Sequence, residues 1–168
     1  MTLVPWNASW SSEEQYEVRN CRWASGAPAM WSPHSPGEGR PLFAKPHMVR
    51  QRRSVAEYRC TVCGEKTPPN DRWWFRLGNT LPGWAFATTE APVHRTCADL
   101  ALKVCPHLRE LGDGPVRWDP PTAVVKAIIG GPATDQDFGL QLNGRKIVGH
   151  LKFVWKTLPI SMQPVAWT

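Results

Sequence analysis

The sequence contains no hydrophobic run long enough to cross a membrane, since a spanning helix needs about 20 mostly apolar residues in succession. It also lacks three motifs of common enzymes: the Gly-x-Ser-x-Gly of esterases, the phosphate-binding P-loop of nucleoside triphosphatases, and the His-Glu-x-x-His of metalloproteases. No internal repeat is visible. These absences argue against a membrane protein, a repeat protein and the commonest hydrolase classes, and no small-molecule substrate is evident.

Cysteine is sparse as well. The chain has 5 cysteines, an odd number, and four of them (Cys60, Cys63, Cys97 and, as an alternative ligand, Cys105) lie in a pattern typical of metal ligands. Small secreted proteins instead carry an even set of cysteines joined as disulfides. We therefore expect free thiols, a reducing compartment such as the cytoplasm, and a bound metal ion.

Proline, glycine and tryptophan, by contrast, are abundant, with Pro 17, Gly 13 and Trp 10 in 168 residues. The Pro and Gly content predicts many loops, and the length fits one domain with extensions. We expect an α+β fold in three parts. Residues 1–44 would form a Pro- and Trp-rich irregular extension, residues 45–112 a basic segment with a zinc module, and residues 113–168 a β-rich part packed on it.

Within the extension, a short helix is predicted from Ser11 to about Asn20, because the run Ser-Ser-Glu-Glu-Gln can cap a helix. Turn residues follow one another from Ala24 to Pro46, so this stretch is expected to be irregular. Tryptophans cluster in this extension and again at Trp73, Trp74 and Trp84, and they are expected to cover a small, loop-rich core. The alternative is that some of them form a stacking or partner-binding surface.

The strongest motif is Cys60-Thr-Val-Cys63-Gly64, followed by His94-Arg-Thr-Cys97. Zinc prefers four sulfur or nitrogen ligands in a tetrahedron, and two short pairs supply them at little cost in loop entropy. Gly64 allows a sharp turn beneath the metal, so that backbone amides can point at the thiolates. The sequence therefore predicts a Zn²⁺ site.

The predicted site is structural, because four protein ligands leave no open position for a catalytic water. The identity of the fourth ligand is the open question. His94 is the nearest histidine to Cys97 along the chain, but Cys105 or His107 could replace it. Cys60–Gly64 has the form of a zinc knuckle, a Cys-x-x-Cys pair followed by glycine. The histidine and the knuckle glycine favour zinc over an iron–sulfur cluster.

The elements expected around this site have a recognisable order. Aromatic residues 72–77 predict a strand, turn residues follow, and residues 84–89 predict the returning strand. A helix is then expected, opened by a capping box at Thr96 and Asp99, with a second short helix from Pro106 to Leu111. Knuckle, hairpin and ligand-bearing helix resemble a treble-clef zinc fold over about residues 55–112.

The last third of the chain is expected to contain β-structure. Asn143-Gly144 lies between alternating residues over 138–148, and this dipeptide favours the type I′ turn of a β-hairpin. Apolar and polar residues alternate over 151–156 and suggest a third strand. Residues 122–129 are ambiguous between helix and buried strand, and their β-branched content favours a strand.

Positive charge gathers immediately before the zinc module. The net charge is +6. Residues 45–59 contain five lysines and arginines and one acidic residue, Glu57. They are expected either to contact nucleic-acid phosphates or to form an ordinary solvated face. Trp73 and Trp74 should point to opposite faces of a strand, which would leave one ring exposed for stacking. The predicted nucleic-acid-binding residues are Lys45, Arg50, Arg52, Arg53, Arg59, Trp73 and Trp74.

The string Ala91-Pro-Val-His94-Arg-Thr-Cys97-Ala, with Cys105-Pro-His-Leu108 after it, resembles a group of small uncharacterised proteins from actinobacteria and their phages. The resemblance implies a bacterial cytoplasmic setting and a phage gene. It carries no known activity. Because small phage proteins often bind and redirect host or phage machinery, the resemblance also implies a protein as a candidate partner.

Three functions follow as hypotheses. The first is a non-enzymatic, zinc-stabilised regulator that binds nucleic acid, and the second is an interaction factor that inhibits or modulates a host or phage enzyme. The third is a metal-dependent nuclease, which some treble-clef domains have become. That family carries a His-His or Asp-His pair before its hairpin, and this chain lacks one. His94 is taken by the metal, so only His107 and His150 would remain as catalytic candidates.

Overall fold

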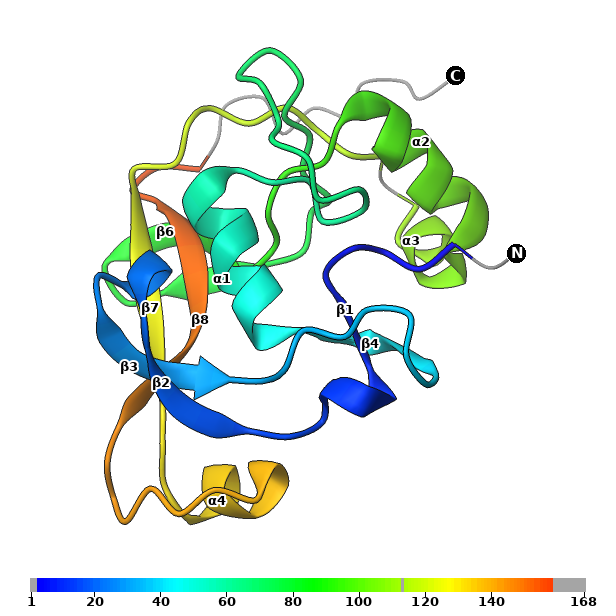
Figure 1. The fold of residues 1–168 in the computed structure, drawn as a ribbon. Coiled ribbons are helices and arrows are strands. Elements are labelled where there is room, and N and C mark those ends of the chain that lie inside the picture. The colour runs from blue at the N-terminus through cyan, green and yellow to red at the C-terminus, as the bar shows by residue number, and fades with distance from the viewer. Residues whose placement is uncertain (1–2, 113, 159–168) are drawn as a thin grey trace.

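The computed structural model describes residues 3–112 and 114–158, and its ribbon is shown in Figure 1. Within these ranges, no helix combines the length and apolar character needed to span a membrane. The elements follow the chain in the order β1 (Ala8–Trp10), η1 (Ser11–Glu13), β2 (Glu17–Cys21), η2 (Arg22–Ala24), β3 (Ala27–Trp31), β4 (Pro41–Pro46), α1 (Met48–Glu57), β5 (Asn79–Leu81), β6 (Trp84–Thr88), α2 (Arg95–Val104), α3 (Pro106–Glu110), β7 (Ala123–Ile129), α4 (Pro132–Phe138) and β8 (Ile147–Trp155).

The fold is mixed α+β and is built on a six-stranded sheet in the order β2-β3-β8-β6-β5, with β7 also paired to β8. A separate small sheet joins β1 to β4. The three segments expected from the sequence all contribute strands to the large sheet. β2 and β3 come from the first segment, β5 and β6 from the second, and β7 and β8 from the third, so the sheet unites them.

Strand β8 is the centre of this sheet. Along one edge it pairs with β7 in antiparallel register from Ile147 to Val154. Along the other edge, β3 meets it only at Val148 and β6 only from residue 153 onward. Residues 149–151 therefore have no strand partner on that edge among the described residues.

Helix α1 fills this gap with side chains. Gln51 Nε2 donates to the carbonyl of Leu151 at 2.8 Å, and Gln51 Oε1 accepts from the Leu151 amide at 3.1 Å, as a neighbouring strand would. Arg52 Nη1 donates to the Gly149 carbonyl at 2.7 Å. Figure 1 shows α1 lying against β8. The helix is buried because its polar side chains complete the hydrogen bonds of the sheet.

Aromatic rings form the main core. Trp74 and Trp118 stack with ring centroids 5.9 Å apart, and Trp155 and Phe153 meet Trp74 edge-on. All four rings are buried, as the interpretation of tryptophan as core residue requires. A second, smaller core around Trp73 lies beneath the cysteines of the metal motif.

The N-terminal prediction is wrong in two respects. The helix expected over 11–20 is only the single 3₁₀ turn η1, after which the chain enters β2. The Glu13 side chain accepts from the Trp10 amide at 2.9 Å and from the Ser35 amide at 2.9 Å, so it closes one turn and then ties it to a distant loop. The stretch 24–46 also contains β3 and β4 instead of being irregular.

Residues 72–77 do not form the expected strand. Trp73 makes an isolated bridge to Val93, and Trp74 makes one to Val116, so adjacent residues pair with different segments. The two rings do point to opposite sides, but each enters a separate core and neither is exposed, at 8% and 3%. The hairpin is instead β5–β6, turning at Pro82 and Gly83.

The C-terminal prediction is partly confirmed. Asn143 and Gly144 have the positive φ values expected of their turn, 51° and 80°, and residues 123–129 form the favoured strand. The strand expected before the turn is instead α4 and a loop, because Asp135 accepts from the Leu142 amide at 3.0 Å. The two strands expected after the turn are one continuous strand, β8.

Candidate metal centre and binding face

The four residues of the predicted metal motif come together in the folded chain. The ligand atoms of Cys60, Cys63, His94 and Cys97 all lie within 4.8 Å of one another, so the group could hold a metal ion. His94 Nδ1 is 3.4 Å from Cys63 Sγ and 3.9 Å from Cys97 Sγ. Cys60 is buried and Cys63 is exposed, so the cluster lies at the surface with one side in the small core.

The orientation of His94 suits metal binding. Its Nε2 lies 3.2 Å from the Lys66 carbonyl oxygen, to which it can donate a hydrogen bond. That bond places the ring proton on Nε2 and leaves the Nδ1 lone pair facing the cysteines. Metal-binding histidines commonly have their second nitrogen fixed by a carbonyl in this way.

The knuckle is held in shape by its neighbours. The Gly64 amide donates to the Cys60 carbonyl at 2.8 Å, and Gly64 has φ +81°, which favours glycine. A β-carbon at Gly64 would lie 2.7 Å from atoms of the Trp6 ring, so the glycine is required by packing as well. Arg59 Nη1 donates to the Gly64 carbonyl at 2.9 Å. The basic residue next to the knuckle therefore supports it.

Helix α2 presents the second pair of ligands. Its N-cap is His94, not Thr96 as the sequence suggested. The missing cap is supplied from outside, because Asp71 Oδ1 accepts from the Arg95 amide at 2.8 Å and from Trp73 Nε1 at 3.0 Å. A carboxylate at a helix N-terminus also complements the helix dipole.

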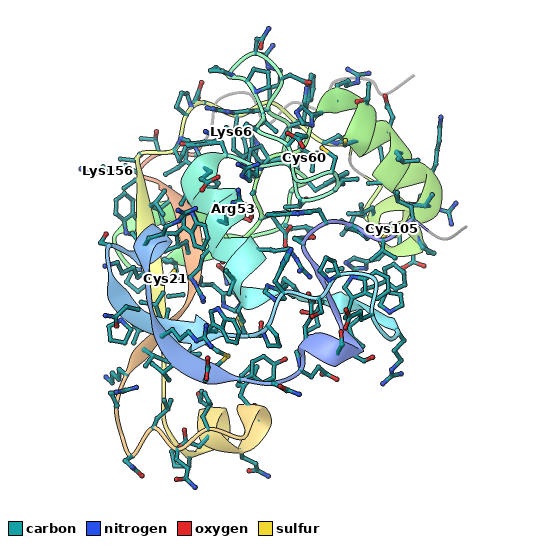
Figure 2. All side chains as sticks on the ribbon, viewed as in Figure 1. Cys21, Arg53, Cys60, Lys66, Cys105 and Lys156 are labelled. Atoms are coloured by element: carbon teal, nitrogen blue, oxygen red, sulfur yellow. The ribbon has the colours of Figure 1, made fainter. Side chains whose placement is uncertain are left out.

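The alternative ligands lie elsewhere. Cys105 is the C-cap of α2, and Figure 2 shows it well away from Cys60 and Lys66. Cys105 and His107 line an apolar groove and do not belong to the cluster. Of the candidates for the fourth position, the structure places His94 at the cysteines.

The three thiols affect one another. Burial, followed by the Cys60 and Cys63 sulfurs nearby, raises the pKa of the Cys97 thiol to about 12. Burial also raises the pKa of Cys60. Thiols this close share a positive ion more readily than they ionise beside one another, which is the usual coupling of metal binding to proton release.

The basic segment is arranged differently from the prediction. Arg50 and Arg52 are 2% and 1% exposed, so neither belongs to an open basic surface. Arg50 forms an ion pair with Glu13 at 2.8 Å. The expectation of a solvated run is wrong for these two residues, because α1 turns them toward the sheet and the N-terminal turn.

The other predicted contacts are partly neutralised. Glu57 accepts from Arg53 at 3.3 Å and from Arg59 on the same oxygen at 2.6 Å. Burial alone would raise the pKa of Glu57, but hydrogen bonds from Trp23 and these arginines outweigh it and lower the pKa to about 2. Lys45 pairs with Glu14 at 2.9 Å.

Arginines outside the predicted set are more exposed and stack on tryptophans. The Arg19 guanidinium carbon lies 3.5 Å from the ring centroid of Trp31, and that of Arg22 lies 4.5 Å from the ring of Trp23. Their side chains are 54% and 73% exposed. We call Arg19, Arg22, Trp23, Trp31 and Arg53 the Trp–Arg face. Its residues come from β2, η2, β3 and α1. The sequence offered the tryptophans of the extension as an alternative stacking surface but did not indicate the arginines beside them.

Two recesses open on this face and share Trp23, Trp31 and Val49. One has a volume of about 410 Å³ and includes Arg52, so we call it the Arg52 recess. The other, of about 230 Å³, includes His47 and Arg50. Aromatic walls beside cationic groups suit ligands that carry both rings and negative charge.

Glu13, His34 and His47 form a second group with metal-ligand atoms within 4.8 Å. Arg50 already provides a cation there. Its Nη1 and Nη2 each donate to the Glu13 carboxylate at 2.8 Å, and Nη1 lies 3.0 Å from His34 Nδ1. The guanidinium neutralises the carboxylate that a metal would need, so we assign this group a structural role.

Ser32 Oγ lies 3.0 Å from His47 Nε2, close to Glu13, which resembles the geometry of a catalytic triad. The tautomer argues against that role. His47 Nδ1 accepts the Arg50 amide of α1 at 3.3 Å, and Nε2 donates to the Pro33 carbonyl at 2.7 Å. With its proton on Nε2, His47 cannot accept the hydroxyl proton of Ser32.

The burial of His47 makes stability depend on pH. Burial, more than the nearby Arg50, lowers the pKa of His47 to about 4 from an ordinary 6.5. The unfolded chain therefore takes up a proton first, and the stabilisation present above pH 6.5 is lost as the pH falls toward 4. Between these values the free energy of unfolding is expected to fall by up to about 1.4 kcal/mol per pH unit from this group. Urea unfolding across this pH range should show that the free energy of unfolding depends less on pH in His47→Asn, which keeps a capping side chain, than in the wild type. Equal slopes would contradict the assignment.

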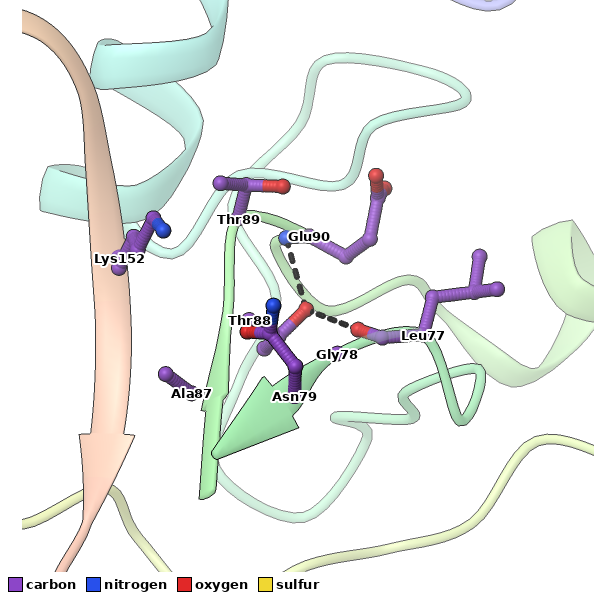
Figure 3. A pocket seen from close by; sticks show the side chains of 8 residues that line it. All are labelled: Leu77, Gly78, Asn79, Ala87, Thr88, Thr89, Glu90 and Lys152. Atoms are coloured by element: carbon purple, nitrogen blue, oxygen red, sulfur yellow. Dashed lines mark hydrogen bonds between the residues drawn. The ribbon is translucent and has the colours of Figure 1, made fainter. Parts of the chain in front are cut away.

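A polar recess of about 350 Å³ lies beside β6 and β8. Figure 3 shows the Thr88 hydroxyl accepting from the Glu90 amide and donating to the Leu77 carbonyl. Burial raises the pKa of Glu90. This recess contains both Glu90 and Lys152, so it has no single sign of charge and we assign it no ligand.

Comparison of the chain with family models, curated proteins and solved structures gave no match. The resemblance to actinobacterial and phage proteins therefore stays a prediction from the motif.

Proposed function

We propose that this chain is a non-enzymatic, zinc-stabilised protein that binds nucleic acid through the Trp–Arg face and acts as a regulator of bacterial or phage origin. The observation that carries the proposal is the stacking of exposed guanidinium groups on Trp23 and Trp31. A planar guanidinium held on an indole keeps its N–H groups free for phosphate oxygens at a low cost in side-chain entropy.

Single-stranded nucleic acid is the ligand that this face favours. Unpaired bases stack on aromatic rings while their phosphates follow a basic groove. The rings of Trp23 and Trp31 are half-buried walls of open recesses, and Trp23 also packs against the edge of the main core. A duplex keeps its bases stacked inside and would use only the arginines.

The cofactor in this proposal is Zn²⁺ in a treble-clef-like module. Ideal tetrahedral zinc, bonded at about 2.3 Å to sulfur and about 2.0–2.1 Å to nitrogen, would place such ligand atoms about 3.6 Å apart. The two sulfur–nitrogen separations of 3.4 and 3.9 Å lie on either side of that value. Knuckle, β5–β6 hairpin and α2 follow in the treble-clef order. Its role is structural, because four protein ligands complete the coordination.

Binding should weaken steeply with salt and respond in opposite directions to two changes of charge. Labelled single-stranded DNA and RNA would be titrated across a salt series, with duplex DNA as a comparison. Arg22→Gln with Arg53→Gln should reduce the salt slope by about 0.7 for each phosphate that the variant no longer neutralises. Glu57→Gln keeps an acceptor for Trp23 but removes the charge that neutralises these arginines, so it should bind more tightly.

The matched control is Arg145→Gln, since Arg145 is exposed beside the Asn143–Gly144 turn and lines neither recess of this face. It should leave binding unchanged. Trp31→Ala should cost about 1–3 kcal/mol if a base stacks there. Absence of binding by the wild type at low salt would overturn the proposal. Cleavage of the labelled strand with added magnesium would replace it with the nuclease hypothesis.

The protein-interaction hypothesis has its own supporting observation. An apolar groove of about 260 Å³ runs between β4 and the α2–α3 pair. Phe43 and Val104 on its walls are 55% and 50% exposed, and exposed apolar groups gathered in a groove favour a protein partner. A complex formed there would resist salt, so the same salt series separates the two functions.

The nuclease hypothesis gains no support from the arrangement of the histidines. His107 lies on α3 at the apolar groove. His150 lies in β8, where burial and then Arg52 lower its pKa. Neither belongs to a described group of three metal-capable side chains.

A further inference from the structure

Two neighbouring arginines of α1 are almost completely buried but differ in how their charge is balanced. Arg50, 2% exposed, has both terminal nitrogens on the Glu13 carboxylate. Arg52, 1% exposed, donates Nη1 to the Gly149 carbonyl and Nη2 to the Met30 carbonyl. Within residues 3–112 and 114–158, no carboxylate lies within ion-pair distance of Arg52. Both terminal nitrogens of Arg52 therefore have hydrogen-bond acceptors, but no carboxylate neutralises its positive charge.

A buried charge without an opposite charge is costly to a folded protein. Burial lowers the pKa of Arg52, and the contact with Cys21 offsets only part of that effect. The same charge helps to lower the pKa of the neighbouring His150. Arg52 Nε also has no hydrogen-bond partner among the described atoms. Both the charge and this N–H call for a group that the described chain does not supply.

Arg52 is not sealed in the core, because it lines the recess of about 410 Å³ on the Trp–Arg face. None of the residues that line this recess is acidic, and Arg19 and Arg22 stand at its rim. Arg19 pairs with Glu17 and Arg22 with Glu57, and neither carboxylate belongs to the lining. The recess is thus a concave site with positive charge at its floor and rim.

We propose that the Arg52 recess is a binding pocket for a phosphate group. Phosphate offers several oxygens for the planar N–H groups of arginine and carries the charge that would neutralise Arg52. The tryptophan walls leave room for a ring next to that phosphate. The ligand would be inorganic phosphate itself or the terminal phosphate of a nucleic-acid strand. The second form extends the proposed function, since the Trp–Arg face is the rim of the recess.

The first test is calorimetric titration of the full-length, metal-loaded protein with inorganic phosphate at constant ionic strength. Saturable one-site binding is expected, weakened at least tenfold by Arg52→Gln and unchanged by Arg145→Gln. Because Arg52→Gln can impair folding, the exposed rim pair Arg19→Gln with Arg22→Gln is the second variant, and it too should weaken binding. No saturable binding at millimolar phosphate, or equal binding by wild type and rim variant, would overturn the pocket.

The second test separates the two sources of phosphate and the two proposals. Identical single-stranded oligonucleotides with and without a 5′-phosphate would be compared at one salt concentration. Tighter binding of the phosphorylated strand, lost in the rim variant, supports a terminal phosphate. Binding of inorganic phosphate without any strand binding keeps the pocket and overturns the nucleic-acid function. Strand binding without binding of inorganic phosphate would keep the nucleic-acid function and overturn the pocket.

Discussion

Replacing Cys60 by Ser is expected to unfold the segment around the metal centre and to abolish metal binding. Cys60 is fully buried in the small core that contains Trp73 and Val93. That core is too small to hold the segment alone, and zinc contributes about 10–16 kcal/mol to the folding of comparable small zinc modules. Removing the metal with a chelator should have the same effect on the wild type.

The measurement is hydrogen exchange by mass spectrometry, together with the metal content per chain. Protection should be lost first over residues 58–66 and 93–105, while β7 and β8 retain it longer. Cys105→Ser is the matched control, because Cys105 lies outside the cluster, and it should keep both metal and protection. A Cys60→Ser protein that stays folded and metal-free would contradict a structural metal.

The second large effect is expected at the buried ion pair. Glu13→Gln leaves the Arg50 guanidinium buried without its counter-charge, and this should lower the free energy of unfolding by about 3–5 kcal/mol. The side chains are 0% and 2% exposed, so water cannot screen the loss. Burial alone raises the pKa of Glu13, but the Arg50 hydrogen bond and two from backbone amides outweigh it, and the net pKa is lowered. The pair therefore contributes most above the ordinary carboxyl pKa.

Urea unfolding near pH 7 would measure the effect. Glu14→Gln is the matched control, since Glu14 is half-exposed and pairs with Lys45 at the surface, and it should change stability by less than about 1 kcal/mol. Glu13→Gln combined with Arg50→Met should recover part of the loss, because both buried charges are then gone. Equal effects of the two glutamate variants would show that the buried pair does not stabilise the fold.

The metal cluster could be predicted because its information is local. Each ligand pair lies within one short motif, and zinc chemistry restricts the residue types and spacings. The structure brings Cys60, Cys63, His94 and Cys97 together as expected. The turn at Asn143 and Gly144 was predictable for the same reason, since two residues determine its backbone angles.

The role of the basic segment could not be predicted, because its partners are distant in sequence. Arg52 meets Gly149, and Gln51 meets Leu151, across about a hundred residues. Periodicity shows which residues of a helix share a face but not that the face covers a gap in a sheet. A helix so rich in arginine is normally interpreted as solvated. The Trp–Arg face was not predicted as a unit because Arg19 and Trp31 lie on separate strands of a segment expected to be irregular.

The central position of β8 has a consequence for how the chain folds on the ribosome. Strands β3 and β6, as well as Gln51 of α1, all require a partner that is synthesised after them. The metal ligands, the last of which is Cys97, emerge earlier. At about 5–20 residues per second, the ribosome needs roughly 3–12 s to travel from Cys97 to Trp155. During that interval the four candidate ligands are available to a metal ion while two strand edges remain open, so this is the period when the chain is most vulnerable to misassembly.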